Sequence, residues 1–367
     1  MKIKKYISLF ILCSLLLSLA SCGKEESAMS LGGVSVSGGV YAYYLACYKQ
    51  YWLSALGQVD DPAFWQTEND GMTNAARLTE ISEEAIKKRI ACAYLFDNYG
   101  LKLTDGELKS IDMMIVGMNA AYDGGNAVAE DEIFSTLGIN ENDVKKILTL
   151  DAKTGALQDY LYGEEGERKI TDGQRESYYQ SNYYRFRLLY LMNGDFIRDE
   201  SGNIVKNEDG NATVKEISDE RYEEKLELAK TILADVRAGA DLQRYIDEYS
   251  DELEKGDYKN GRYLCSVSEY GTLISASVMR LGVNEAGLLD TKNGIYVLQR
   301  LPLDDYAWKN EENEAGGDFN SFESLVLEYE FDEYIKPHVE KIVKNTDVTE
   351  KYKMEELPYT FSWQYLF

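Results

Sequence analysis

Side chains able to do acid–base or nucleophilic chemistry are few in this chain and form no familiar catalytic pattern. The 367 residues include a single histidine, His338, and no GxSxG, HExxH, Walker A or Rossmann sequence. One histidine cannot supply both a Ser-His-Asp triad and a histidine-based metal site. The cysteines beyond residue 22 are odd in number and lack CxxC spacing, which predicts neither a disulfide framework nor a zinc site: Cys47, Cys92 and Cys265. We therefore expect no metal and no cofactor, with His338 at a surface or helix end.

One further segment has the spacing of metal ligands. Asp199, Ser201 and Asn203 are spaced like the start of a calcium loop. The glycine and the distal glutamate that such a loop requires are absent. Because turn-forming residues surround them, the favoured interpretation is a solvated hairpin from Ile204 to Val214.

The charge of the chain excludes some partners. Its formal net charge is −25, and loss of three lysines with a signal peptide would give −25 − 3 = −28. Such a chain is repelled by nucleic acid and by anionic lipid. The favoured interpretation of this charge is that it keeps the protein soluble. The alternative is that it attracts basic, unfolded secreted chains.

The N-terminal residues predict secretion and a lipid anchor. Three lysines precede an apolar run from Ile7 to Leu19, which is too short to span a bilayer and is typical of a signal peptide, here residues 1–21. The run ends in Leu-Ala-Ser-Cys22, which resembles the bacterial lipobox, so Cys22 is the expected lipidation site. The alternative is an ordinary signal peptide with an incidental cysteine. A flexible, lipid-anchored tether over 22–33 would then hold the protein at the outer face of the bacterial cell membrane.

Regular periodicity predicts an α+β region in the second half of the chain. Strands are expected over 186–192 and 294–298. Apolar residues recur at helical spacing in 222–238 and in 241–249, with Asp241 placed to cap the second helix.

The first half of the chain predicts helices with defined beginnings. Thr104 with Glu107, and Thr171 with Gln174, are spaced as capping boxes, and Asn140 is placed to cap a third helix. Each precedes residues with apolar side chains at helical spacing.

The second half resembles the parvulin peptidyl-prolyl isomerase domain of the PrsA- and SurA-type foldases. The similar sequences, in order, are AGADL with EYS (238–242 and 248–250), NGRYL (260–264), LGVNE (281–285) and GIYVL (294–298). The earlier LTDGE, GIN and ITDGQ sequences resemble the chaperone domain of the same foldases. The resemblance implies four segments: a mainly helical N-terminal chaperone domain (34–182), an inserted parvulin-like domain (183–305), a linker (306–319) and a C-terminal segment packing back on the chaperone domain (320–367).

The resemblance also implies where catalysis would occur. In this family two histidines and a carboxylate or thiol lie beside the twisted prolyl amide, and an apolar pocket holds the proline ring. The histidine positions correspond to Leu188 and Tyr296, and the carboxylate falls near Asn260, so no catalytic residue is predicted. The implied substrate-binding residues are apolar or aromatic, and ordinary core packing explains them equally well: Tyr270, Ile274, Met279 and Tyr296.

The sequence therefore favours an extracytoplasmic foldase or holdase lipoprotein with a degenerate parvulin-like domain. Its expected partners are unfolded or nascent secreted proteins and the membrane that holds the anchor, with no nucleic acid. One alternative is an active peptidyl-prolyl cis-trans isomerase that uses Tyr296. The other is a non-catalytic lipoprotein that scaffolds one dedicated partner or binds a solute.

Overall fold

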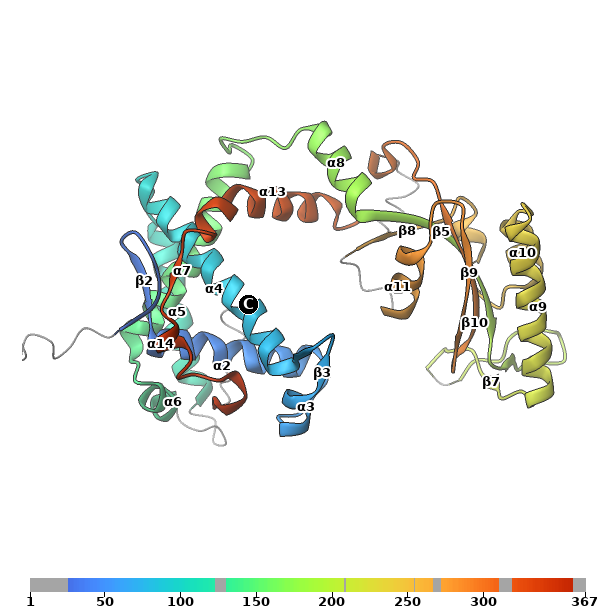
Figure 1. Ribbon diagram of the computed structural model, residues 1–367, viewed down its shortest axis with the longest axis horizontal. Coiled ribbons are helices and arrows are strands. Elements are labelled where there is room, and N and C mark those ends of the chain that lie inside the picture. The colour runs from blue at the N-terminus through green and yellow to red at the C-terminus, as the bar shows by residue number, and fades with distance from the viewer. Residues whose placement is uncertain are drawn as a thin grey trace, which may run out of the picture. The chain divides into compact units, whose positions relative to one another are not determined.

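The chain adopts an α+β fold of helices and small antiparallel sheets, divided into two compact units (Figure 1). The first unit is built from Met1–Lys169 and Tyr329–Phe367, and the second from Ile170–Glu328. The computed structural model describes residues 26–122, 130–207, 209–253, 255–266, 272–309 and 319–358. No helix among these residues is long and apolar enough to cross a membrane.

The first unit is mainly helical. Its elements from the first segment are β1 (Ser27–Leu31), β2 (Val34–Ser37), α2 (Gly38–Ala55), α3 (Pro62–Gln66), β3 (Glu68–Asn69), β4 (Met72–Thr73), α4 (Asn74–Asn98), α5 (Asp105–Tyr122), α6 (Glu130–Leu137) and α7 (Glu141–Tyr162). The second segment adds the end of α13 (Phe322–Val339), β11 (Val343–Lys344), α14 (Thr346–Thr349) and the 3₁₀ helix η3 (Met354–Glu356).

The three predicted caps of this half are present. The hydroxyl of Thr104 accepts from the amide of Glu107 at 3.2 Å, and the Glu107 carboxylate accepts from the Thr104 amide in return. Thr171 and Gln174 form the same reciprocal pair at the start of α8 (Asp172–Asn182), and Asn140 caps α7. Local sequence fixes these helix starts because a cap needs only residues within one turn.

The predicted tether over 22–33 is wrong for its second half. β1 pairs with β2 on one side and with β11 on the other, and Ala28 and Met29 are fully buried. β1 forms a hairpin with β2, which follows it directly in sequence, and its other edge is covered by β11 from the C-terminal segment. Cys22 and the predicted signal peptide lie outside the described residues.

The second unit is built on a four-stranded antiparallel sheet in the order β8-β5-β10-β9. The strands are β5 (Tyr183–Met192), β8 (Arg262–Cys265), β9 (Ala286–Thr291) and β10 (Gly294–Leu301). The remaining elements are α8, β6 (Asp195–Phe196), β7 (Val214–Lys215), α9 (Asp219–Arg237), α10 (Leu242–Tyr249), the 3₁₀ helices η1 (Lys255–Tyr258) and η2 (Ala307–Lys309), and α11 (Thr272–Arg280). The predicted helices and strands of this region are confirmed, with Asp241 accepting from the amide of Gln243 at 3.1 Å.

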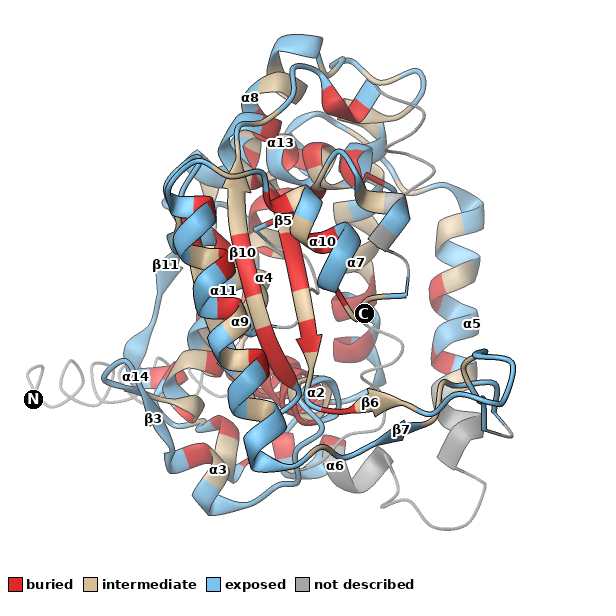
Figure 2. Ribbon diagram, turned by 90° about the vertical axis from the view of Figure 1, so that its right-hand side faces the viewer, coloured by how far each residue is buried: buried red, intermediate tan, exposed pale blue. Residues whose placement is uncertain are grey.

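Helices cover both faces of this sheet. α9 and α10 lie on one face and α11 lies on the other (Figure 1). Leu189, Leu191, Ile295 and Val297 point toward α9 and α10 and form one core with their buried residues. The two central strands β5 and β10 accordingly consist of buried and half-buried residues, with none exposed (Figure 2).

The boundary between the units differs from the predicted one. Residues 170–182, expected in the chaperone domain, belong to the second unit because Tyr178 and Tyr179 of α8 are buried in its core. The expected linker 306–319 begins with buried residues, since Trp308 of η2 is 5% exposed and packs in the same core. Phe322 and Val326, at the start of α13, also belong there.

The insertion between β6 and β7 contains the predicted hairpin between Ile204 and Val214, preceded by a second turn at 199–203. Isolated bridges join Arg198 to Ile204 and Lys206 to Ala212. Asp199 accepts from the amides of Ser201 and Asn203, both at 2.9 Å, and these backbone hydrogen bonds lower its pKa. The carboxylate is thus engaged by its own turn.

Candidate functional site

The positions implied for catalysis lie on the two central strands of the second unit. β5 and β10 are antiparallel, with Leu298 opposite Leu188 and Tyr296 opposite Tyr190. Since side chains alternate along a strand, the even-numbered residues of both strands share the face that α11 covers. Phe186, Leu188 and Leu298 are buried there, with Tyr190 and Tyr296 packed against them.

Leu188 and Tyr296 make this face a packing and hydrogen-bonding surface. Leu188 is 7% exposed and belongs to the core. The rings of Tyr296 and Tyr190 stack, with centroids 4.7 Å apart and planes at 17°. The Tyr190 hydroxyl donates to the carbonyl of Asn293 at 2.9 Å. Neither position offers a group that exchanges protons near neutral pH.

The protonation of the two phenols follows from their surroundings. Burial, followed by the neighbouring Tyr296, raises the pKa of Tyr190 to about 12. Burial also raises the pKa of Tyr296. Both hydroxyls remain protonated at neutral pH, so each can donate a hydrogen bond but cannot act as a general base.

The implied substrate-binding residues are only partly brought together. Ile274 of α11 packs against this core beside Tyr296. Met279, in contrast, is 38% exposed, and Val278 fills the core in its place. Val278 lies four residues after Ile274 and so on the same helix face, whereas a five-residue step turns the side chain away. Tyr270 lies outside the described residues.

Asn260 does not carry a chemical group into this face. It follows η1 and is exposed, and its backbone carbonyl accepts from Nε of Arg185 at 2.8 Å. Gly261 follows with a φ of +90°, in the region that favours glycine. The residue therefore serves the turn that leads into β8.

A buried ion pair at the edge of the same face was not predicted from the sequence. Arg262 of β8 lies opposite Phe186, is 9% exposed, and forms an ion pair with Glu252. Its guanidinium also lies 3.8 Å from the ring centroid of Tyr258. The cavity beside them, which Leu188 also lines, measures only about 10 Å³, room for about one water molecule. Arg262 stands in the NGRYL sequence, but its acid partner is ten residues earlier and has no recognisable spacing.

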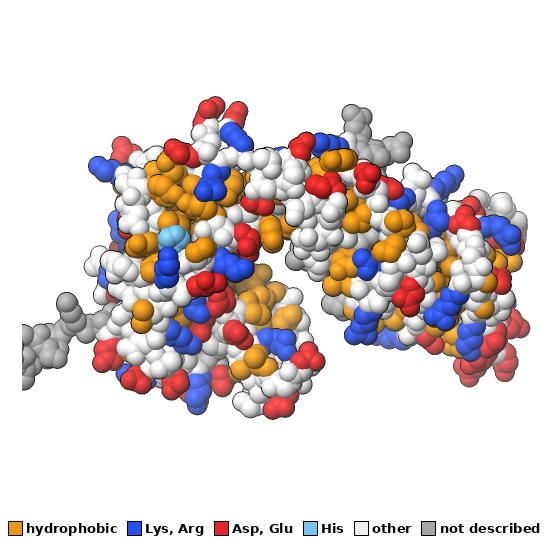
Figure 3. All heavy atoms as spheres, turned by 45° about the horizontal axis from the view of Figure 1, so that its top comes forward, with side chains coloured by type: hydrophobic (Ala, Val, Ile, Leu, Met, Phe, Trp, Pro, Cys, Tyr) orange, Lys and Arg blue, Asp and Glu red, His pale blue; other side chains and the backbone are white. Residues whose placement is uncertain are grey.

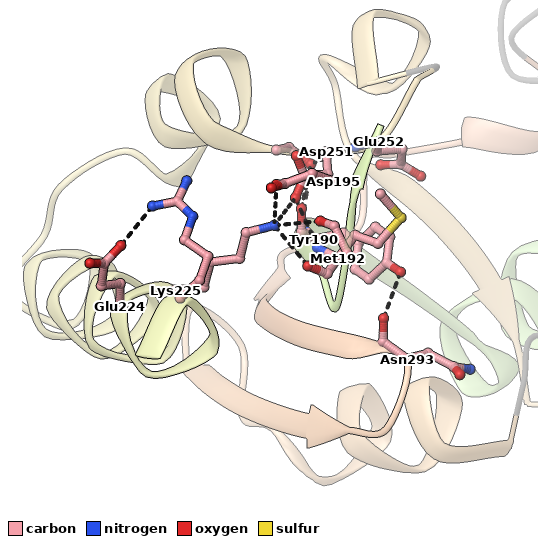
Figure 4. Close-up of polar contacts among 11 residues, drawn as sticks. Tyr190, Met192, Asp195, Glu224, Lys225, Asp251, Glu252 and Asn293 are labelled. Carbon is pink, nitrogen blue, oxygen red and sulfur yellow. Dashed lines mark hydrogen bonds and ion pairs between the residues drawn. The ribbon is translucent and has the colours of Figure 1, made fainter. Parts of the chain in front are cut away.

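A second charged group of this unit is structural. Figure 4 shows Nζ of Lys225, from α9, surrounded by oxygen atoms. It donates to the carbonyls of Met192 and Gly194 at 2.8 and 2.9 Å, and lies 3.3 Å from Asp251 and 3.6 Å from Asp195. These contacts fix the end of β5 and leave the amine no freedom to react.

The chain's histidine lies in the first unit and takes no part in this site. His338 is near the end of α13, half-buried, with its ring centroid 5.8 Å from that of Tyr94. Partial burial, with the nearby Lys341, lowers its pKa. In the space-filling view it lies beside hydrophobic side chains (Figure 3).

Comparison with known proteins finds structural similarity only. No protein family matches the sequence, and no curated protein shows significant sequence similarity. The foldase protein PrsA from Streptococcus pneumoniae is similar in structure, with a TM-score of 0.24 and 13% identity over 81% of this chain and 95% of that one. PrsA from Bacillus subtilis has a TM-score of 0.23 and 12% identity, over 80% of this chain and 93% of that one. The peptidylprolyl isomerase PrsA from Bacillus cereus has a TM-score of 0.27 and 14% identity, over 78% of this chain and 90% of that one. At such scores, only the residues of this chain can support an argument about its site.

Proposed function

We propose that this protein is a membrane-anchored extracytoplasmic foldase or holdase that binds unfolded secreted polypeptides, and that its parvulin-like unit binds without acid–base catalysis. The observation that carries the proposal is the chemistry of the sheet face that α11 covers, the α11-side face, formed by the even-numbered residues of β5 and β10. Leu188 and Tyr296 stand where the resembled family has histidines, and the strands around them present aliphatic and aromatic side chains. The aliphatic residues of this face are buried, so contact with apolar peptide segments falls to half-buried aromatic side chains such as Tyr190 and Tyr296 and to exposed residues at the edge of the face.

Exposed apolar residues next to this face support binding. Leu273 and Met279 of α11 are 61% and 38% exposed, and Val283, just beyond the helix, is 52% exposed. Methionine and leucine side chains on a surface adapt to many partners because they are flexible and apolar. Unfolded chains present varied apolar segments, so an adaptable surface suits them.

The proposed location rests on the N-terminal sequence. The lysines, the apolar run and Cys22 are together typical of a lipoprotein that is exported and then acylated. Secreted clients reach the outer face of a membrane unfolded, in a compartment that contains no ATP. A holding activity that depends on binding alone fits that setting.

The first experiment measures proline isomerisation in a tetrapeptide by exchange NMR, using the chain without residues 1–22 and its Tyr296→Phe variant. We expect no acceleration by either protein, together with suppressed aggregation of several unrelated denatured proteins. If the protein accelerates proline isomerisation and the Tyr296→Phe variant does so less, the protein is instead an isomerase. Recovery of one partner on pull-down, with no suppression of aggregation, would make it a scaffold.

The isomerase is the second candidate because of the stacked phenols. Tyr190 and Tyr296 hold protonated hydroxyls beside an apolar face. A hydrogen-bond donor can stabilise a twisted prolyl amide, whose nitrogen regains its lone pair. Tyr296→Phe removes one donor while keeping the ring, so it separates this role from packing.

A further inference from the structure

A hollow of about 750 Å³ opens on the first unit, far in sequence from the residues discussed above. The beginning of α4 lines it with Ala76, Thr79 and Glu80. The C-terminal segment lines it with residues that include Glu350 and Tyr352. A hollow of this size falls within the range of ligand-binding sites.

A buried hydrogen-bonded group fixes the wall of the hollow. Glu83 of α4 is 7% exposed and accepts from the hydroxyl of Tyr41 at 2.6 Å. Nζ of Lys344 donates to the same carboxylate at 2.7 Å. Burial and the adjacent Glu83 raise the pKa of Tyr41, so it remains a donor. Held from α2, α4 and β11 at once, this wall is rigid.

The remaining charges of the hollow are negative and unpaired. Glu80, Glu350 and Glu355 have no lysine or arginine within 4.0 Å among the residues that the structure describes. The two lysines of the lining are already paired, Lys344 with Glu83 of the wall and Lys353 with Glu356. An uncompensated negative potential in a concave surface attracts cations.

A polar atom in the wall also lacks a partner. Thr349 lines the hollow and is 3% exposed, and its hydroxyl oxygen has no hydrogen-bond partner within the described part of the chain. Buried hydroxyls are normally satisfied by protein or water. The wall of the hollow therefore contains a hydroxyl group whose hydrogen bond is not made.

The cation that fits is organic rather than metallic. Among the described residues no three His, Cys, Asp or Glu side chains are close enough together to hold a metal ion. Tyr352 is half-buried and lines the hollow beside the carboxylates, with the buried ring of Tyr41 packed behind it at a centroid distance of 6.3 Å. Carboxylates with aromatic rings favour a guanidinium or ammonium carried on an aliphatic stem.

We infer that this hollow binds an arginine or lysine side chain of an extended polypeptide. The inference rests on the proposed function for the identity of that polypeptide as a client, and it names the class of client segment that the first unit selects. The net charge of −25 would draw such basic segments toward the protein before they dock. The α11-side face of the second unit would then take apolar segments.

The test uses a five-residue blocked peptide, Ala-Ala-Arg-Ala-Ala amide, titrated by NMR or calorimetry into the chain without residues 1–22. The comparison peptide carries citrulline, which is neutral and nearly the same shape as arginine. We expect the arginine peptide to bind and the citrulline peptide to bind much more weakly. We expect binding to weaken further at about 0.3 M salt, because partly exposed charges are then screened.

Two variants locate the binding. Glu80→Gln with Glu350→Gln, both at exposed positions, should lower affinity about five-fold. Glu200→Gln with Glu216→Gln makes the same charge change in the second unit and should leave affinity unchanged. Ala76→Leu, also at an exposed helical position, should narrow the hollow and weaken binding without lowering the melting temperature.

Either of two results would overturn the inference. One is an equal loss of affinity for the arginine peptide in the two double glutamate variants, and the other is an unchanged affinity in Ala76→Leu. Aggregation assays with a basic client separate this failure from failure of the proposed function. If the wild-type chain fails to suppress aggregation, the proposed function is wrong. If suppression persists undiminished in Glu80→Gln with Glu350→Gln, only the role of the hollow is wrong.

Discussion

Replacing Lys49 by methionine should destabilise the first unit strongly. Lys49 lies in α2 and is 1% exposed. Its ammonium group donates to the carbonyls of Glu355 and Leu357 at 3.1 and 2.8 Å, and pairs with Asp60 at 2.8 Å. Methionine keeps most of the aliphatic stem but supplies no donor, so the substitution isolates the loss of these polar contacts.

The magnitude follows from the groups left behind. Each buried carbonyl that loses its donor costs about 1 kcal/mol or more. Asp60 loses its cation but keeps the indole donor of Trp65 at 2.7 Å, and its side chain is 26% exposed, so its share is about 1 kcal/mol. The total loss is roughly 3 kcal/mol, which is a large part of the stability of an ordinary domain.

The assay is urea denaturation followed by tryptophan fluorescence, together with amide hydrogen exchange. Exchange should accelerate most in residues 346–357, because Lys49 holds that segment. Lys336→Met is the matched control, since Lys336 is 58% exposed and pairs only with the neighbouring-turn Glu333. It should change the free energy of unfolding by less than about 0.5 kcal/mol. A loss below about 1 kcal/mol in Lys49→Met, with unchanged exchange in the C-terminal segment, would refute the reasoning.

Three further predictions concern buried groups. Lys225→Met should lower the free energy of unfolding of the second unit by about 3 kcal/mol, measured by urea denaturation, because two carbonyls and a carboxylate lose their donor. Cys47, Cys92 and Cys265 are all buried, and burial raises the pKa of Cys92 to about 12, so Ellman's reagent at pH 8 should label none rapidly until the chain unfolds. Because the pKa of Tyr190 is raised from 10.0 to about 12 on folding, its contribution to stability is full below pH 10 and is lost as the pH rises through 12. Tyr190→Phe should therefore make the decline of stability over that pH range less steep, as measured by urea denaturation at each pH.

Much of the second unit could be predicted because its determinants are local. The strands around Leu188 and Tyr296 and the helices α9 and α10 show regular periodicity, and Asp241 caps a helix with its own neighbours. The sequence could not show that Val278, rather than Met279, fills the core, because that depends on which face of α11 meets the sheet, and a role for Met279 in substrate binding stays a prediction.

The missed features depend on contacts between distant residues. β1 is covered on one edge by β11, and Lys49 can be buried because acceptors come from Glu355 and Leu357. Arg262 needs Glu252 to be buried. Nothing near β1, Lys49 or Arg262 in the sequence specifies these partners, and residues 22–33 were therefore interpreted as a tether. The hollow lined by Glu80 and Glu350 was missed for the same reason.

The first unit is completed by residues that are synthesised after the whole of the second unit. Lys49 and its acceptor Leu357 are 308 positions apart. Until β11 is available, β1 is paired only with β2 and its other edge is open to solvent. The second unit is continuous in sequence, so all its residues are available earlier. Closing so long a loop is slow, so the first unit passes through a period in which its own apolar residues lack their cover. A protein proposed to shelter unfolded chains therefore passes through an exposed, incompletely folded stage of its own.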